Sequence, residues 1–240
     1  MSPGRKKIDI SVLIPSYNEE KYIGACLASI KRQKFSGTYE VIVGDGYSKD
    51  RTGKIAKDYG CKVVLESWGT PSGGRYAAAT KARGRIYAIT SADVQIPENW
   101  LEEIKKRFDK DERVSWGVGA VSPQDGNLLE KVGAAVLNFM ASVMNGFGVA
   151  YVNADNLMCR ADAYKKAGEF NPKLMTSEDT DLGMRLMKTG KFAYFSKAKV
   201  LISMRRIRKW GYLNFVVFHT RNWLNTHLFA RPAEIYAPVR

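Results

Sequence analysis

The chain has 240 residues, a length that suits one large α/β domain better than two small ones. Hydrophobic residues make up 45% and charged residues 26%, a balance that excludes an intrinsically disordered chain and an integral membrane bundle. The formal net charge is +14. The 3 cysteines are odd in number and far apart, so we expect free, buried thiols, and the 2 histidines leave no Cys/His metal-binding spacing.

Two apolar stretches have to be weighed as membrane segments. Residues 8–14 are interrupted by Asp9 and closed by Pro15, so they are too short for a signal sequence or a span, and a cytoplasmic protein is expected. Residues 132–154 carry no charge and are long enough to cross a bilayer. Their glycines and asparagines are poor helix formers, so a buried or interfacial helix followed by a strand is the better interpretation.

Apolar, β-branched strands alternate with helices along the first hundred residues. Strands are predicted over residues 8–14, 39–43, 62–65 and 86–89. Helices are predicted after an Asn18 cap, over residues 51–59 and 75–82, and from Pro97, with a loop over residues 69–74. The alternation predicts a mostly parallel sheet with helices on both faces. Ligands bind beyond the carboxyl ends of such strands, so residues 15–17, 45–46 and 91–93 are expected to form one crevice.

Two aspartates follow strands of this sheet. At these positions, the carboxylates of Asp45 and Asp93 can bind a ligand hydroxyl, an amide N–H or a cation. Asp93 and Gln95 are two residues apart, a spacing that lets both side-chain oxygens reach one Mg²⁺ or Mn²⁺. The sequence has no Walker-type phosphate loop, no nucleophile elbow and no dinucleotide fingerprint, which excludes the matching hydrolase and dinucleotide-binding classes.

Four segments together resemble family 2 glycosyltransferases of the GT-A fold. They are Ile-Pro-Ser-Tyr-Asn-Glu-Glu at 14–20, residues 41–52 around Asp-Gly-Tyr-Ser, Thr-Ser-Ala-Asp-Val at 90–94, and Ser-Glu-Asp-Thr-Asp-Leu at 177–182. The resemblance covers residues 8–210 and keeps the family's order. It implies an inverting, metal-dependent enzyme that uses a UDP- or GDP-linked sugar.

The resemblance also implies roles for the matching positions. Donor binding falls to residues at both ends of the chain: Pro15, Tyr17, Glu19, Asp45, Arg75, Asp93, Arg205 and Arg206. Asp93 matches the metal-ligating acid of the family's Asp-x-Asp motif, and Gln95 resembles a further ligand of dolichyl-phosphate mannose synthases. Asp179 matches the general base of inverting members.

Two motifs depart from the family pattern. Ser91 stands where the Asp-x-Asp motif has its first acid, so one charge near the metal is missing. The second motif reads Asp-Gly-Tyr-Ser, whereas Asp-Asp-Gly-Ser is commoner.

In the last motif, three acids lie in the first turn of a predicted helix, and Thr176 or Ser177 offers its N-cap. For Asp181 we expect helix-dipole complementation only.

The positive charge is concentrated in the C-terminal part. From residue 188 onward the chain has 11 lysines and arginines and a single acid, Glu234, which gives a net charge of +10. Tryptophans, tyrosines and phenylalanines are interleaved with them, which is typical of a segment at an anionic membrane surface. A solvated basic face beside a core helix is the alternative. Nucleic acid binding is not expected, because no recognition motif accompanies the charge.

These features predict a GT-A domain over residues 1–210, with a nucleotide-binding half at 8–95 and an acceptor half at 96–210, and a basic aromatic segment at 211–240. The expected reaction moves a sugar to a hydroxyl of a glycan or lipid-linked acceptor at the cytoplasmic face of the membrane. A polyprenyl-phosphate sugar synthase, a sugar nucleotidyltransferase and a non-catalytic membrane-surface domain remain as alternatives. The pair Glu178-Asp179 favours a hydroxyl acceptor, because a phosphate acceptor needs no base.

Overall fold

Strands and helices alternate along the first hundred residues as the sequence predicts. The computed structural model describes residues 7–234. The first half contains β1 (Ile10–Ser16), α1 (Ile23–Lys31), β2 (Tyr39–Asp45), α2 (Thr52–Asp58), β3 (Lys62–Leu65), α3 (Pro71–Thr80), β4 (Ile86–Ile89) and α4 (Trp100–Lys110). The second half contains β5 (Val114–Pro123), α5 (Leu128–Gly146), η1 (Ala154–Asn156), β6 (Leu157–Arg160), α6 (Ala161–Lys166), α7 (Glu178–Leu186), β7 (Lys191–Ile202), α8 (Arg205–Trp210) and α9 (Tyr212–Phe229). The basic residues before position 7 and the last six residues of the predicted segment 211–240 lie outside the described residues.

All seven strands join one sheet in the order β3-β2-β1-β4-β6-β5-β7. β1 pairs in parallel with β2 and β4, β2 with β3, and β5 with β7. β6 runs antiparallel to β4 and β5. The predicted mostly parallel sheet is therefore confirmed, with one reversed strand whose short apolar sequence gives no sign of its direction.

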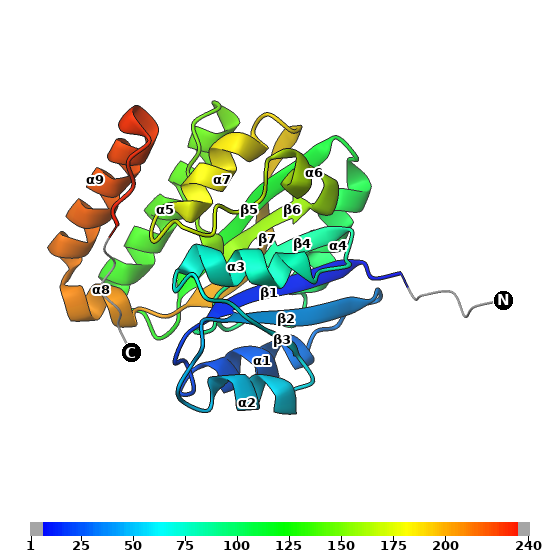
Figure 1. Ribbon diagram of the computed structural model, residues 1–240. Helices are drawn as coiled ribbons and strands as arrows, with labels where there is room; N and C mark the ends of the chain where they lie inside the picture. Colours follow the sequence, from blue (N-terminus) through cyan, green and yellow to red (C-terminus); the bar gives the residue numbers. More distant parts are fainter. Residues whose placement is uncertain (1–6, 235–240) are drawn as a thin grey trace.

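Helices cover both faces of the sheet, which explains why its strands are apolar on both sides. Along β1, Ile10, Val12 and Ile14 enter a core with α1, α2 and α4, whereas Leu13 enters a second core with α3, α6 and α7. Figure 1 shows α1 and α2 on one side of the sheet and α3 on the other. The three-layer α/β architecture follows from this alternation.

The strands β1 and β2 end side by side. Their register pairs Ser16 with Asp45, and Asp45 in turn pairs with Leu65 at the end of β3. Helix α3 begins directly against this edge, because a Cβ atom on Gly44 would lie 1.9 Å from the carbonyl oxygen of Gly74. Glycine at position 44 thus lets α3 close one wall of the expected crevice.

The N-terminus of α1 differs from the predicted one. Asn18 adopts a left-handed φ of 52°, and its side-chain Oδ1 accepts a hydrogen bond from the backbone N–H of Lys49. The helix begins only at Ile23. Asn18 therefore joins the loops after β1 and β2, and the prediction that it caps this helix is wrong.

Two further helix starts differ from expectation. Thr70 caps α3 by accepting from the N–H of Gly73 at 2.8 Å, so residues 71–74 of the predicted loop are helical. A threonine cap followed by Pro71 outweighs two glycines that suggest a loop. Helix α4 begins at Trp100, and Pro97 precedes it without entering its first turn.

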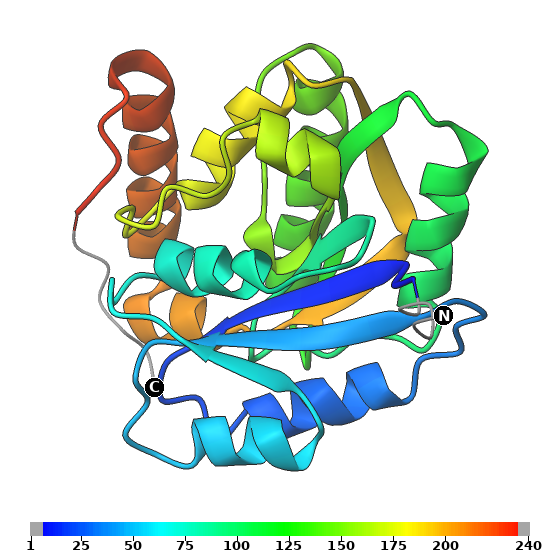
Figure 2. The same ribbon diagram turned by 45° about the vertical axis from the view of Figure 1, so that its right-hand side comes forward.

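The C-terminal segment folds against α5. The Glu130 side chain accepts two hydrogen bonds from Arg208 at 2.8 Å and one from the Tyr212 hydroxyl at 3.0 Å. The same carboxylate completes a capping box with Asn127 at the start of α5. Figures 1 and 2 show α9 at one edge of the molecule, next to α8. The division of the chain at residue 210 stays a prediction.

The uncharged stretch 132–154 forms most of α5 and is followed, after η1, by β6. Several of its apolar side chains face outward, and Phe139 is 67% exposed. Within residues 7–234, no helix combines the length and the apolar content needed to cross a bilayer. All three cysteines are free, as predicted, but only Cys26 and Cys159 are buried, whereas Cys61 is partly exposed.

Candidate active site

The carboxyl ends of β1, β2 and β3 carry the polar groups at one end of the predicted crevice. Asp45 is buried, and its Oδ1 accepts from the hydroxyl and the N–H of Ser48. Glu66, directly after β3, accepts from the N–H groups of Trp68 and Gly69. Asp45 and Glu66 both shape the loops here. Asp45 holds the turn after β2 in place. Its contact with a nucleotide base stays a prediction.

Exposed aromatic rings lie beside these acids. Tyr17 is 41% exposed and Tyr47 is 57% exposed, the latter with a left-handed φ of 58°. Pro15 lies against Gly74 in the first turn of α3. Rings held at the rim of a crevice offer flat surfaces for a planar ligand such as a nucleobase.

Asp93 follows β4 and contacts a residue 112 positions further along the chain. Its Oδ2 accepts from Nε of Arg205 at 2.9 Å, and Nη2 of Arg205 donates to Oε1 of Glu19 at 2.7 Å. The Arg205 guanidinium also lies 4.3 Å from the ring centroid of Tyr22. The structure therefore brings together three residues that the sequence assigns to the donor: Glu19, Asp93 and Arg205.

Arg206 lies elsewhere. Its guanidinium is over the ring of Trp210, at 5.4 Å from the centroid. Partial burial and, to a lesser extent, the charge of Arg206 lower the pKa of His219 on α9 to about 4. Neighbouring arginines on α8 thus point to different surroundings. Arg205 reaches the crevice, and Arg206 packs toward α9.

The segment after β4 connects the crevice with the second half of the sheet. Ser91 Oγ donates to Oδ1 of Asp155 on η1 at 2.5 Å and accepts from Nη2 of Arg75 at 3.4 Å. Arg75 is buried and donates to Oε1 of Glu178 at 2.7 Å. Arg75 therefore lies beneath the crevice as a link between Ser91 and α7.

Three acids of the first turn of α7 have different surroundings. Glu178 is held by Arg75, and Asp181 pairs outward with Arg185. Asp179 accepts from the N–H of Ala154 at 3.1 Å and from its neighbour Thr180 at 2.7 Å. These backbone N–H groups fix the Asp179 carboxylate beside η1, whereas Asp181 forms an ion pair within its own helix in addition to the expected helix-dipole complementation.

Burial changes the protonation of this cluster. It raises the pKa of Asp179 and of Asp155, and the charge of Asp93 raises the pKa of Asp155 further. Burial, reinforced by the charges of Asp179 and Asp155, raises the pKa of Glu178 to about 7, although Arg75 opposes that shift. A carboxylate with a raised pKa is a stronger proton acceptor than an ordinary one, as a general base requires.

Helix α9 holds the N-terminus of α7. Ser177 occupies the N-cap position with a left-handed φ of 53°, and its side chain makes no capping bond. Its hydroxyl instead accepts from Nδ2 of the buried Asn222 at 2.7 Å. The sequence placed the cap at the right position, but the side chain is used to attach α9.

Asp93 and Gln95 fit a cation site only in part. Both alternate with the buried Ala92, Val94 and Ile96, so they project to the same side of the segment. Among residues 7–234 there is no group of three or more His, Cys, Asp or Glu side chains arranged to hold a metal. Magnesium is commonly bound by one or two carboxylates together with substrate phosphates, so this oxygen set suits an ion that arrives with its nucleotide.

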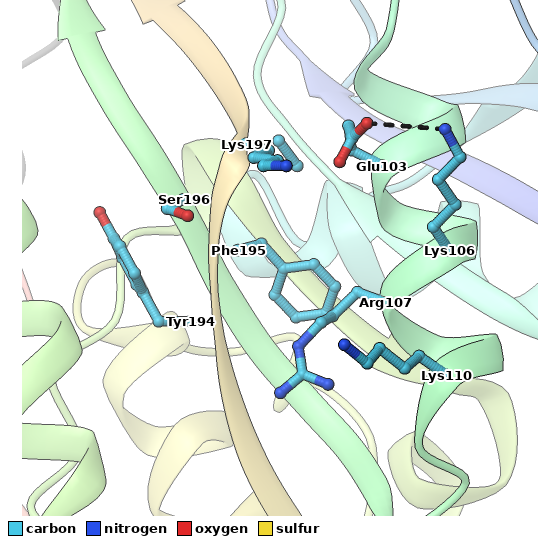
Figure 3. Close-up of a pocket in the computed structure, with 9 residues that line it drawn as sticks. Glu103, Lys106, Arg107, Lys110, Tyr194, Phe195, Ser196 and Lys197 are labelled. Atoms are coloured by element: carbon cyan, nitrogen blue, oxygen red, sulfur yellow. Dashed lines mark ion pairs between the residues drawn. The ribbon is translucent and has the colours of Figure 1, made fainter.

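A separate surface pocket of about 310 Å³ lies between α4 and β7 (Figure 3). Lys106, Arg107, Lys110 and Lys197 line it with Glu103, and Lys106 pairs with Glu103. None of the predicted site residues contributes to this pocket. The candidate active site is the crevice at the carboxyl ends of the strands.

The family model described as "Glycosyl transferase family 2" matches residues 11–168, more than half of the chain. The chain belongs to glycosyltransferase family 2. It is therefore an enzyme of the glycosyltransferase class, and the sequence-based prediction of family, enzyme class and GT-A fold is confirmed.

Curated relatives of this family 2 chain are distant. Glycosyltransferase AglE of Haloferax volcanii is 26% identical over 193 residues, which is 75% of this chain and 62% of AglE. The poly(ribitol-phosphate) β-N-acetylglucosaminyltransferase TarS of Staphylococcus aureus is 33% identical over 107 residues, 42% of this chain and 19% of TarS. The chain thus spans less than two thirds of the length of these relatives.

Solved structures show the same fold. TarS 1–349 in complex with UDP superimposes with a TM-score of 0.69 at 21% identity, over 92% of this chain and 72% of that one. The mannosyltransferase PcManGT of Pyrobaculum calidifontis, solved with GDP-Man and Mn²⁺, gives 0.66 at 20% identity over 93% and 62%. At this identity the likeness establishes the GT-A fold of the family 2 chain.

Two acids of the site were missed by sequence reasoning. Glu66 and Asp155 belong to none of the four motifs. Asp155 carries one available signal, because it is the first charge after residues 132–154 and directly precedes a short apolar strand. The rule that places ligands after strands does not find it, since Asp155 comes before β6 and reaches the crevice only because β6 is reversed.

Proposed function

We propose that the enzyme transfers a sugar from a nucleoside diphosphate sugar to an acceptor hydroxyl with inversion at the anomeric carbon. The observation that supports this most is the arrangement of Asp93, Arg205 and Asp179 around one crevice. An anion-binding guanidinium and a cation-binding carboxylate lie together after β4, and a second carboxylate lies on α7 with both oxygens oriented by backbone N–H groups.

Each residue has a separate task in this proposal. Arg205 turns from Asp93 and Glu19 toward the diphosphate, where its planar group pairs with phosphate oxygens. Asp179 accepts the proton of the acceptor hydroxyl as that oxygen attacks. Arg75 stays buried, balances Glu178, and so keeps the start of α7 in place.

Asp93 and Gln95 are the residues proposed to hold Mg²⁺ or Mn²⁺ in this site. A bound divalent cation would neutralise charge on the departing nucleoside diphosphate. The donor itself is proposed to be a UDP- or GDP-linked sugar, since TarS structures contain UDP or UDP-GlcNAc and PcManGT contains GDP-Man and Mn²⁺.

The acceptor is proposed to be a glycan or lipid-linked glycan at the cytoplasmic surface of an anionic membrane. The first turns of α5 and α9 meet where Tyr212 bonds Asn127, and they expose Leu128 at 78% and Leu213 at 76%. Lys131 and Lys209 are exposed nearby, whereas Glu130 is buried beneath Arg208. Asp125, just before α5, is an exposed acid here, and its carbonyl oxygen accepts a hydrogen bond from Arg208. Cations around exposed apolar side chains suit an anionic bilayer surface.

This membrane surface adjoins the crevice. Helix α8 connects the two, because it contributes Arg205 to Asp93 and Arg208 to Glu130. A lipid-linked acceptor held at the corner of α5, α8 and α9 would have its hydroxyl near the donor. A polyprenyl-phosphate acceptor is the second candidate, and the response to loss of the Asp179 base separates it from a hydroxyl acceptor.

The purified protein tests the proposal with UDP and GDP sugars, with and without Mn²⁺. A ligand that binds only the folded state stabilises it by about 2.7 kcal/mol at a hundredfold excess over its Kd, so the binding nucleotide raises the melting temperature. We expect one nucleotide class to do so in the presence of Mn²⁺, and the matching sugar to be hydrolysed slowly without acceptor. The absence of both effects for every donor would refute a catalytic role and favour a non-catalytic surface domain.

A further inference from the structure

Ser91 and Asp155 form a hydrogen-bonded pair at the position where the sequence lacks an acid. Ser91 is two residues before Asp93, and its Oγ donates to Oδ1 of Asp155 at 2.5 Å. Asp155 comes from a different element, η1, 64 residues along the chain. We propose that Asp155 supplies, from η1, the second carboxylate of the cation site that Ser91 does not provide. This inference rests on the metal-assisted function proposed above.

The backbone around Asp155 is fixed from both sides. Its carbonyl oxygen accepts from Oγ1 of Thr90 at 2.9 Å, and its N–H donates to Oδ1 of Asn153 at 2.9 Å. The next residue along, Asn156, is fully buried and donates to the carbonyl oxygens of Ala120 and Ala198. Asp155 is therefore held rigidly, as the ligand of a preorganised site must be.

Only one carboxylate oxygen of Asp155 is used within the described part of the chain. Oδ1 accepts from Ser91, whereas Oδ2 has no hydrogen-bond donor among residues 7–234. Ser91 thus orients the carboxylate and leaves its second oxygen for a ligand. In metal sites, a residue that does not bind the metal itself commonly orients a ligand through such a hydrogen bond. Ser91 would have this role for Asp155.

The charges around Asp155 favour a bound cation. Five carboxylates gather here, namely Glu19, Asp93, Asp155, Glu178 and Asp179, and two guanidinium groups face them. Arg75 is paired with Glu178, and Arg205 is shared between Glu19 and Asp93. Among residues 7–234, neither Asp155 nor Asp179 forms an ion pair, although the charge of Arg75 also acts on both. Carboxylates that are partly withdrawn from water and have no ion-pair partner are costly. A divalent ion beside Asp93 and Asp155 would compensate this excess.

A purely structural role of Asp155 makes a different prediction. In that case the pair with Ser91 only attaches η1 to the segment after β4, and an amide at position 155 would keep the attachment. The cation-site role requires the negative charge itself. Ser91→Asp combined with Asp155→Asn separates these two roles. It removes the carboxylate from position 155 and places one at position 91, where the family motif has an acid.

The experiment measures Mn²⁺ affinity by electron paramagnetic resonance on the full chain, with UDP or GDP present, for four proteins. They are the unaltered chain, Asp155→Asn, Ser91→Asp with Asp155→Asn, and Asp162→Asn as an exposed control on α6. Loss of a group that supports a metal site lowers affinity by about 10–100-fold, and we expect this for Asp155→Asn. The double variant should recover most of the lost affinity, and the control should match the unaltered chain.

Three outcomes overturn the inference. Unchanged Mn²⁺ affinity in Asp155→Asn would assign Asp155 to structure alone. A double variant as weak as Asp155→Asn would show that the two positions do not share one site. If the unaltered chain binds nucleotide without any dependence on Mn²⁺, the metal-assisted function fails together with this inference. Thermal unfolding of each variant shows that it is folded, and the double variant still tests the exchange of charge if Asp155→Asn alone does not fold.

Discussion

Nε of Arg205 donates to Oδ2 of Asp93 across 2.9 Å, although the two residues are 112 positions apart. The carboxylate proposed to bind a divalent cation is thus already paired with a cation of the protein. Glu19 shares the same guanidinium. A metal ion at Asp93 would therefore have to compete with Arg205 until a diphosphate offers Arg205 another anion.

Arg205→Gln is expected to change two affinities in opposite directions. Mn²⁺ alone should bind more tightly, because Asp93 loses its competing cation. The nucleoside diphosphate should bind at least ~10-fold more weakly, since a hydrogen bond to a charged group contributes about 1.5–3 kcal/mol. Calorimetric titration with Mn²⁺ and with UDP or GDP measures both, and Arg221→Gln on the exposed face of α9 is the control. Equal loss of both affinities would show that Arg205 supports the fold of the site and does not compete for Asp93.

Asp93→Asn is expected to remove the metal dependence of nucleotide binding while the fold survives. The amide keeps the shape of the side chain but not its charge, and Asp93 is partly exposed at the crevice. Gln95→Ala should weaken the dependence less, because its backbone bonds with Leu201 keep the segment in place. Nucleotide titrations with and without Mn²⁺ measure the effect, with Asp58→Asn on α2 as an exposed control. Metal-dependent binding that persists in Asp93→Asn would refute the assignment.

Asp179→Asn is expected to reduce turnover by about 10²–10⁴-fold, the usual contribution of a general base, with donor affinity nearly unchanged. Asp181→Asn is the matched control on the same helical turn, since Asp181 pairs with Arg185 on the outer side. Steady-state rates with donor and acceptor, beside donor binding by titration, separate the two effects. A loss in Asp181→Asn alone would move the base to position 181. Little loss in either variant would favour a phosphate acceptor.

The sequence contains enough information for the four strands of the first hundred residues, because apolar strands and amphipathic helices alternate there with short connections. It did not predict β5, β7 or the reversed direction of β6. The carboxyl-end rule placed Asp45 and Asp93 at the same edge. The parallel registers agree, because β1 pairs Ser16 with Asp45 and Leu13 with Ile89, the last residue of β4. The predictions that failed concern local features that are determined by contacts with residues distant in the sequence. Asn18 reads as a cap, but its side chain bonds Lys49 from the next loop.

The site was harder to predict than the fold. Motif matching assigned Glu19, Asp93 and Arg205 to the donor, and the structure joins them in one network. It missed Asp155, because the contact with Ser91 depends on the antiparallel entry of β6 beside β4. Sequence spacing carries no trace of that contact. The reversed strand brings Asp155, from the second half of the chain, to Ser91 in the first half.

Glu130→Gln tests how α8 and α9 are attached, and it predicts a pH dependence. Hydrogen bonds from Arg208, together with those from Asn127 and Tyr212, lower the pKa of Glu130 from 4.5 to about 2. Its stabilising contribution is therefore complete above pH 4.5 and is lost as the pH falls toward 2. Urea unfolding at pH 7 should show a loss of about 1–3 kcal/mol in the variant.

At pH 3 the difference between Glu130→Gln and the unaltered chain should be smaller, because the unaltered chain has then lost part of the same contribution. Glu112→Gln, exposed after α4, is the control and should change neither curve. A difference that stays constant from pH 7 to pH 3 would show that shape, and not the charge of Glu130, holds the C-terminal helices.

The membrane surface proposed at the corner of α5, α8 and α9 is tested by charge reversal at two matched places. Lys131→Glu with Lys209→Glu alters the corner, and Lys54→Glu with Lys57→Glu alters the exposed face of α2 by the same net charge. Each lysine near an anionic surface contributes about 1 kcal/mol, so the corner variant should lose most of its binding to phosphatidylserine-containing liposomes. Co-sedimentation at low salt measures the binding to liposomes, and higher salt should release the unaltered chain because screening shortens the range of the attraction.

If both double variants bind equally well, the attraction comes from the overall charge of +14 and not from this corner. If the unaltered chain does not bind at all, the exposed leucines there belong to a contact with a protein or a second copy, and a soluble acceptor replaces the lipid-linked one.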